Sequence, residues 1–299
     1  MGVSMYSICK WCKMLFGNSI FHVDQGEGGC YSKTDIKGYY NDLTEKVLRD
    51  NKDILVPKYD IDGSGERYFS IGIFQYGLAA WDLYLKTGED GYKEKTLACA
   101  EWAIDNQQKD GGWVTFDYKK DGHPYSAMAQ GQAISLLVRC YKETGDAKYL
   151  TAAETAEKFM LLPISEGGTA NYENGGTAFY ECTNEPLILN GWIFSLWGIF
   201  DYFKCTGDTA AGEILDRTLL TLKNRLSEFD CGYWSKYDTD KRIASEFYHK
   251  LHIAQLKTMY DLFGDDIYMQ YSKRWQSFAL SRAKKTRAFI VKAIQKVGE

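Results

Sequence analysis

Residues 134–162, ISLLVRCYKETGDAKYLTAAETAEKFMLL, decide the fold. An apolar segment at 134–145 ends in CYKETG, and a more charged amphipathic segment at 147–162 follows at once. Gly145 stands where a left-handed helix C-cap is needed, so the pattern predicts two helices joined by a tight turn. One such pair cannot bury its apolar face alone and needs neighbours of the same kind.

The same pattern recurs along the chain. Segments that end in LYLKTG at 83–88, YFKCTG at 202–207 and YDLFG at 260–264 resemble the CYKETG end, and the terminal glycines lie 57, 62 and 57 positions apart. More charged segments follow at 92–107 and 209–226, and the last repeat continues into one long helix from 266 to about 296. Because the first helix of each pair is the more apolar, we expect inner helices surrounded by outer ones.

This repeat predicts an all-α fold. The form that fits is an α/α toroid, an incomplete (α/α) barrel of repeated helical hairpins with short β-hairpin or loop insertions. An ordinary helical bundle is the alternative. Residues 21–299 form the predicted single catalytic domain, and residues 1–20 form a separate N-terminal segment.

Composition excludes some classes of function. The chain has 299 residues, 36 Lys and Arg against 40 Asp and Glu, and a formal net charge of −4. This mild acidity argues against nucleic acid as a partner, because nucleic-acid binding needs a basic face. An aromatic content of 15% with few prolines suits a helical protein that stacks on sugars.

The N-terminal segment and the cysteines bear on location. No secretory signal is recognisable, and Cys99, Cys140 and Cys205 fall inside helical patterns as buried thiols, so we expect a cytoplasmic protein. Residues 8–21 mix large apolar side chains with lysines and are too short to span a bilayer. They are a candidate for peripheral contact with the inner face of the membrane, and a short helix packed on the body is the alternative.

The inner helices all run in one direction, so their N-termini meet at one mouth of the ring. Helix N-termini carry partial positive charge and free N–H groups, and such a mouth attracts anions. Polar side chains gather at these ends and in the adjoining loops: Gln75, Tyr76, Gln130, Gln132, Tyr180, Glu181, Asn190, Tyr237, Tyr248, His249 and His252.

Five blocks of sequence resemble the D-glucuronyl C5-epimerase family, in the C-terminal catalytic domain of those enzymes. The blocks are GYYNDLT at 38–44, YF at 68–69 with QYGL at 75–78, SAMAQGQA at 126–133, LNGWIF at 189–194, and FYHKLHI at 247–253. The resemblance covers roughly residues 20 to 280 and implies an α/α toroid that converts glucuronate to iduronate within a polysaccharide, without a nicotinamide cofactor. The sequence shows no strand pattern for the β-sandwich parts of the animal enzymes, so we expect it to resemble the short bacterial form.

The resemblance also implies catalytic residues. Tyr237, followed by Asp238, and Tyr248, followed by His249, match the two further tyrosines of the family. The family's Glu-Tyr pair falls on Glu181 and Cys182, a departure from the family pattern, with Tyr180 on the other side of the glutamate. The implied partner is an anionic glucuronate-containing glycan, and a homodimer is compatible with the resemblance.

The chemistry explains the residue types. Hydrogen at C5 of a uronate becomes removable only when the adjacent carboxylate is neutralised, for which Arg242, His249, His252 and the helix N-termini are candidates. Inversion then needs a base on one face of the sugar and an acid on the other, so we expect Tyr237 and Tyr248 to flank one sugar. A nearby cation must lower the pKa of the tyrosine that acts as base.

Structural roles compete with these functional ones. Gln130 and Gln132 could satisfy buried backbone, Arg242 could pair with Asp238 or Glu246, and Trp113 and Trp234 could pack turns rather than bind sugar. No third ligand accompanies His249 and His252 at metal-site spacing, so no metal is expected.

Three other functions also stay open. A polysaccharide lyase would form the same enolate, a glycoside hydrolase would need two carboxylates, and a glycan-binding homologue would have lost activity.

Overall fold

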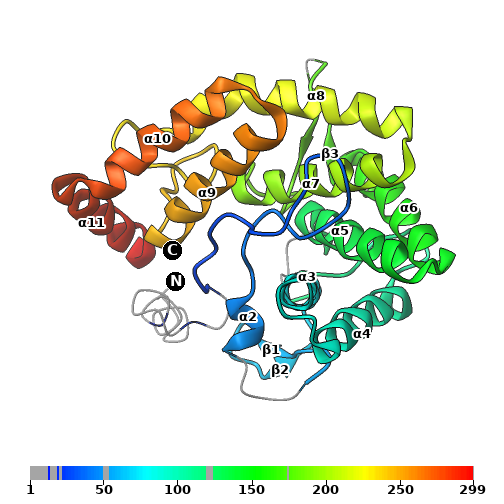
Figure 1. The fold of residues 1–299 in the computed structure, drawn as a ribbon. Helices are drawn as coiled ribbons and strands as arrows, with labels where there is room; N and C mark the ends of the chain where they lie inside the picture. Colours follow the sequence, from blue (N-terminus) through cyan, green and yellow to red (C-terminus); the bar gives the residue numbers. More distant parts are fainter. Residues whose placement is uncertain are drawn as a thin grey trace.

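The computed structural model describes residues 13, 19, 22–49, 54–118, 124–173 and 175–298. Helices dominate this part of the chain, and the strands form two short antiparallel hairpins, so the predicted all-α class is confirmed (Figure 1). The hairpins are β1 (Tyr59–Asp60) with β2 (Glu66–Arg67), and β3 (Ala170–Asn171) with β4 (Ala178–Phe179). Short helices in the loops are α2 (Glu45–Leu48), η1 (Ile164–Glu166) and η2 (Leu226–Phe229).

Four helical hairpins are arranged around a centre, as the repeat predicted (Figure 1). The inner helices are α3 (Ser70–Thr87), α5 (Ala127–Thr144), α7 (Leu189–Thr206) and α9 (Glu246–Phe263). The outer helices are α4 (Asp90–Asn106), α6 (Ala147–Leu161), α8 (Thr209–Arg225) and α10 (Asp266–Leu280). Most side chains of α7 are buried, as expected for an inner helix that outer helices cover.

Glycine ends every inner helix. Gly88, Gly145, Gly207 and Gly264 adopt left-handed backbone with φ of 74°, 72°, 70° and 73°, and each donates its N–H to the carbonyl four residues earlier. Residues with a Cβ pay a steric penalty in this conformation, so glycine sets the point at which each hairpin turns. The four C-caps expected from the sequence are confirmed.

The prediction of one long helix from 266 to about 296 is wrong. Helix α10 ends at Leu280, Ser281 has extended backbone (φ −81°, ψ 111°), and α11 (Arg282–Gly298) begins directly after it. The Ser281 carbonyl accepts the N–H of Lys285, and its hydroxyl lies 3.5 Å from the N–H of Lys284. Ser281 is therefore the N-cap of a new helix, a role that serine favours.

Helices α5 and α7 pack backbone to backbone at two glycines. A Cβ built on Gly131 would lie 2.6 Å from Cα of Ser195, and one built on Gly198 would lie 2.4 Å from Cα of Gly131. Neither clash involves a flexible side chain that could rotate away. The two glycines therefore set the distance between the two central inner helices.

Replacing Gly198 with Ala is expected to destabilise the protein by about 1–3 kcal/mol or more, because the added methyl must separate the two helix backbones. The measurement is the free energy of unfolding in urea. Gly91→Ala is the matched control: Gly91 also lies in a helix, but its added Cβ would meet nothing within 4 Å. That substitution is expected to add up to about 1 kcal/mol of stability, and an equal effect of both would contradict the packing argument.

The segment at 22–43 crosses the middle of the ring, drawn in blue in Figure 1. Arg139 on α5 forms a fully buried ion pair with Asp201 on α7 at 2.6 Å, and its guanidinium donates to the carbonyls of Lys37 and Gly38. The Tyr40 hydroxyl donates to the same aspartate. This network, between Arg139, Asp201, Tyr40 and the two carbonyls, fastens the segment to the inner helices.

The sequence raised two questions about the membrane: whether a helix spans it, and whether residues 1–20 contact its surface. No helix among the described residues combines the length and apolarity needed to cross a bilayer. Apart from residues 13 and 19, the segment 1–20 lies outside the described residues, and with it the predicted peripheral contact. The boundary of the catalytic domain at residue 21 stays a prediction.

Candidate active site

The N-terminal ends of the four inner helices meet around one cavity of about 180 Å³, which we call the central cavity. It is lined by His22, Gln25, Ile61, Phe69, Ile71, Gln75, Phe116, Tyr118, Met128, Glu181, Asn190, Phe194, Phe247, Tyr248 and Leu251. Every inner helix contributes at least one side chain from its first two turns. The expected convergence of the helix N-termini is confirmed.

Glu181 lies against the first turn of α7. Nδ2 of Asn190 lies 3.5 Å from Oε2 of Glu181, and a Cβ on Gly191 would come within 2.4 Å of the same oxygen. Glycine at 191 thus leaves room for the carboxylate beside the N-terminus of α7, where the partial positive charge of the helix favours it. Oδ1 of Asn190 is buried without a hydrogen-bond partner among the described residues.

Tyr237 and Tyr248, the tyrosine pair, lie in contact. Their ring centroids are 4.7 Å apart at an interplanar angle of 58°. Tyr248 lines the central cavity, and Tyr237 packs behind it on the loop that precedes α9. The expectation that the two tyrosines flank one sugar is therefore wrong, because no sugar ring fits between rings in contact.

The pKa values of both tyrosines are raised. Burial is the largest cause, the Glu181 carboxylate adds to it, and Arg242 opposes it without reversing it. Both phenols are consequently protonated at neutral pH. The expected nearby cation is present as Arg242, but it lowers these pKa values too little to bring them below the ordinary value. A tyrosine that acts as base here therefore needs a group to receive its proton.

Arg242 lies outside the lining of the central cavity. Its guanidinium forms ion pairs with Asp238 and with Glu185, the latter at 3.0 Å, and its Cζ lies 5.3 Å from the centre of the Tyr237 ring. Two carboxylates therefore neutralise the arginine that the sequence proposed for the substrate carboxylate. It positions the tyrosine pair and the loop before α9.

His249 and His252 are buried within the body rather than in the cavity. Nδ1 of His249 accepts the N–H of Ser235 at 3.1 Å, Nε2 lies 3.0 Å from the carbonyl of Trp275, and the ring stacks on Trp234. Nδ1 of His252 lies 3.1 Å from Oγ of Ser235. Burial lowers the pKa of His249 to about 4 and that of His252 to about 3, so both are neutral at pH 7 and neither supplies a cation.

These lowered pKa values predict acid lability. The unfolded chain binds protons at these histidines below about pH 6.5 and the folded chain does not. Their contribution to stability is therefore constant above that pH and falls as the pH drops toward about 3–4. Each histidine contributes about 1.4 kcal/mol per pH unit within its window.

Substituting His252 with Gln is expected to flatten this loss. The measurement is the urea midpoint at pH 7 and pH 5 for both proteins. Asp82 also titrates in this range, because burial raises its pKa to about 7, and its effect on stability has the opposite sign. Since Asp82 is present in both proteins, the difference between their changes in urea midpoint reports on His252 alone. Equal losses of stability in both proteins would show that His252 does not control the loss of stability in acid.

Four other residues singled out from the sequence lie away from the central cavity. The Tyr76 hydroxyl donates to the carbonyl of Ile54, and the Tyr180 side chain lies beside Arg225 at the end of α8, so Tyr180 does not replace the family tyrosine at Cys182. Gln130 and Gln132 are fully buried in α5, where Gln132 lies beside Tyr39. Of the proposed substrate-binding residues, Gln75 and Asn190 line the cavity.

His22, Gln25 and Tyr118 line the cavity and were missed. His22 and Gln25 belong to the segment that crosses the ring, and Tyr118 belongs to the loop between α4 and α5. Neither stretch has helical periodicity, and residues 22–25 precede the first block that resembles the family. A histidine near an aromatic residue was the available signal, and alone it predicts nothing.

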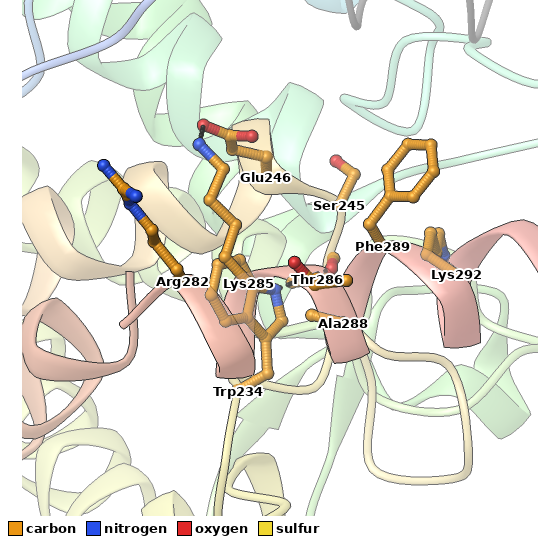
Figure 2. Close-up of a pocket in the computed structure, with 10 residues that line it drawn as sticks. Trp234, Ser245, Glu246, Arg282, Lys285, Thr286, Ala288, Phe289 and Lys292 are labelled. Atoms are coloured by element: carbon orange, nitrogen blue, oxygen red, sulfur yellow. Dashed lines mark hydrogen bonds and ion pairs between the residues drawn. The ribbon is translucent and has the colours of Figure 1, made fainter. Parts of the chain in front are cut away.

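A second cavity, of about 370 Å³, lies between α11 and the segment 234–246 (Figure 2). Two of the cations that line it have protein partners: Lys285 pairs with Glu246 at 2.7 Å, and Lys292 donates to the carbonyl of Ile243. Trp234 is 2% exposed and donates its indole N–H to the carbonyl of Ala244, just as Trp113 donates to Ala103. Both tryptophans pack turns and are not sugar platforms. Among the described residues, no group of three or more His, Cys, Asp or Glu side chains could hold a metal ion.

Residues 107–277 match the family model described as the C-terminus of D-glucuronyl C5-epimerase. The chain belongs to the D-glucuronyl C5-epimerase family. The matched region contains Glu181, Asn190 and the tyrosine pair, and it ends within α10.

This epimerase-family chain is similar in sequence to two relatives. It is 31% identical over 156 residues to an uncharacterized protein of Methanocaldococcus jannaschii, across 50% of this chain and 51% of the relative. It is 29% identical over 217 residues to a D-glucuronyl C5-epimerase of Caenorhabditis elegans, across 63% of this chain and 35% of the relative. The aligned parts thus span about half and about a third of the two relatives.

Solved structures share the fold. A GH76A α-1,6-mannanase from Salegentibacter sp. HEL1_6 has a TM-score of 0.50 at 14% identity, over 79% of this chain and 66% of its own. A GH76 α-mannanase from Bacteroides thetaiotaomicron has a TM-score of 0.51 at 13% identity, over 72% and 57%. At these identities the similarity concerns the fold alone, and it agrees with the α/α toroid of the epimerase-family chain.

Proposed function

We propose that this protein is a uronate C5-epimerase that converts D-glucuronate to L-iduronate within an anionic polysaccharide. The observation that carries the proposal is the coincidence of family membership with a cavity that holds Glu181, Tyr248 and three amides. Among the described lining residues Glu181 is the one carboxylate, whereas a glycoside hydrolase needs two across the bond it cleaves. The residues therefore favour proton transfer over hydrolysis.

The proposed mechanism begins at the substrate carboxylate. The amide groups of Gln75 and Asn190 line the cavity and would donate hydrogen bonds to the carboxylate as negative charge flows into it from C5. Tyr248 takes the C5 hydrogen or returns it, and Tyr237 supports it from behind. Since the tyrosine pair occupies one side of the cavity, a group elsewhere in the lining serves the other face of the sugar, and Glu181 is our candidate.

The decisive experiment is hydrogen exchange at C5. The protein is incubated in heavy water with a panel of glucuronate-containing polysaccharides, heparosan among them. Label at C5 with iduronate formed and chain length unchanged supports the epimerase. Shortened chains with unsaturated ends would instead indicate a lyase, and binding without label would indicate a glycan-binding homologue.

The cysteines support a cytoplasmic site for this activity. Cys30, Cys99, Cys140, Cys182, Cys205 and Cys231, the cysteines of the described part, are all free thiols. Free thiols persist in reducing compartments.

A further inference from the structure

His22 lies beside the hydroxyl of Tyr248. Nε2 of His22 is 3.4 Å from the Tyr248 oxygen, and the His22 ring meets the rings of Phe247 and Tyr248 edge-on, at centroid distances of 5.1 Å and 5.8 Å. Both His22 and Tyr248 line the central cavity. A substrate in this cavity would therefore contact the two residues together.

Ser19 orients the imidazole. Oγ of Ser19 lies 3.1 Å from Nδ1 of His22 and accepts the backbone N–H of His22 at 3.0 Å. When Nδ1 carries the proton and donates it to Ser19, Nε2 has a lone pair directed at the Tyr248 hydroxyl. The partner of one ring nitrogen thus sets the role of the other, as is usual for histidines that transfer protons.

The surroundings of the Tyr248 hydroxyl explain why such a partner is needed. In the part of the chain that the structure describes, the titratable and charged groups around Tyr248 are Tyr237, Glu181, Cys182, Arg242 and His22. Burial and the Glu181 carboxylate hold the phenol in its protonated form. Among these groups, histidine is the one whose ordinary pKa, about 6.5, lies near neutrality.

We propose that His22 receives the proton of Tyr248 when this tyrosine acts as the base of the reaction, an inference that rests on the proposed function. The C5–H bond of the uronate breaks, and its electron pair enters the enolate formed with the carboxylate. The C5 proton bonds to the Tyr248 oxygen while the original phenolic proton moves to Nε2 of His22. The tyrosine stays neutral, His22 becomes the imidazolium, and in the reverse direction the same two transfers return the proton to C5.

The test compares His22→Gln with the wild-type protein. Glutamine can keep a hydrogen bond but cannot accept a proton, so the rate of deuterium incorporation at C5 of heparosan, or of whichever panel glycan the wild type labels, should fall about 100-fold or more at pH 7. The wild-type rate should also fall in acid, because imidazolium cannot accept a proton, and this loss of rate in acid should be absent from the variant. Circular dichroism at each pH measures the folded fraction.

A second variant separates chemistry from packing. In His22→Ala, added imidazole should restore part of the exchange if His22 transfers protons, and it should restore none if His22 only supports Phe247 and Tyr248. A folded His22→Gln protein with wild-type rate and an unchanged loss of rate in acid would overturn the inference, as would the absence of rescue. A wild-type chain that labels no glycan of the panel would overturn the proposed function itself, and the inference would fall with it.

Discussion

Replacing Tyr248 with Phe is expected to lower the rate of C5 hydrogen exchange by about 100- to 10,000-fold, the usual contribution of one positioned acid or base. The phenyl ring keeps the contact with Tyr237 and Phe247, so the loss should come from the missing hydroxyl and not from unfolding. The measurement is the initial rate of deuterium incorporation into the glycan, together with the midpoint of thermal unfolding.

Tyr260→Phe is the matched control for this substitution. Tyr260 lies on the same helix, α9, in its last turn, far along the chain from the cavity lining. Its rate should stay near that of the wild type. A Tyr248→Phe protein that keeps more than about a tenth of the wild-type rate would show that another residue transfers the proton, and Tyr237 and Glu181 would be substituted next.

Replacing Arg139 with Met is expected to destabilise the protein by about 3–5 kcal/mol, which is the cost of removing one partner from a buried ion pair. Methionine nearly fills the volume, so the loss reflects the broken ion pair and not a cavity. Asp201 is left with Lys204, at 3.6 Å, as its cation. The carbonyl of Gly38 loses its donor, whereas that of Lys37 keeps the indole N–H of Trp81. The free energy of unfolding in urea measures it. Activity should fall with it, because the segment 22–43 carries His22 into the cavity.

Two further variants test whether the buried ion pair is the cause of this loss. Lys142→Met, on the exposed side of the same helix, removes a charge without burying one and should change stability by less than about 0.5 kcal/mol. Arg139→Met combined with Asp201→Asn should recover part of the loss, since neither charge is then left alone. A double variant less stable than both single ones would mean that the remaining hydrogen bonds of the network dominate.

The ring was predictable because its determinants are local. Each inner helix ends at a glycine whose conformation other residues adopt only with strain, and four such ends at similar spacing define four hairpins. The joint position of Asn190, Gln75 and Tyr248 followed from helix direction alone. The break at Ser281 was not predictable in this way, because a serine within a charged helical pattern continues the helix as readily as it caps a new one.

The site was less predictable because it depends on which way single side chains point. Tyr76 and Gln75 are neighbours in one block, yet one turns to Ile54 and the other to the cavity. His249 and His252 lie near Tyr248 in sequence but face Ser235 and the body of the protein. His22 reaches the cavity from 226 residues away, a contact that no local pattern contains.

The segment across the ring also constrains how the molecule is made. Lys257 pairs with Glu27, and Asp261 pairs with Tyr31, over 230 positions of sequence. On the ribosome, the residues of this segment emerge before α9 and find these partners only after about 230 further residues have been made. Tyr39 and Tyr40, fully buried in the finished protein, also wait for later helices, since their partners Arg139 and Trp197 lie on α5 and α7. Such late, long-range closure is slow and leaves the nascent chain prone to aggregation.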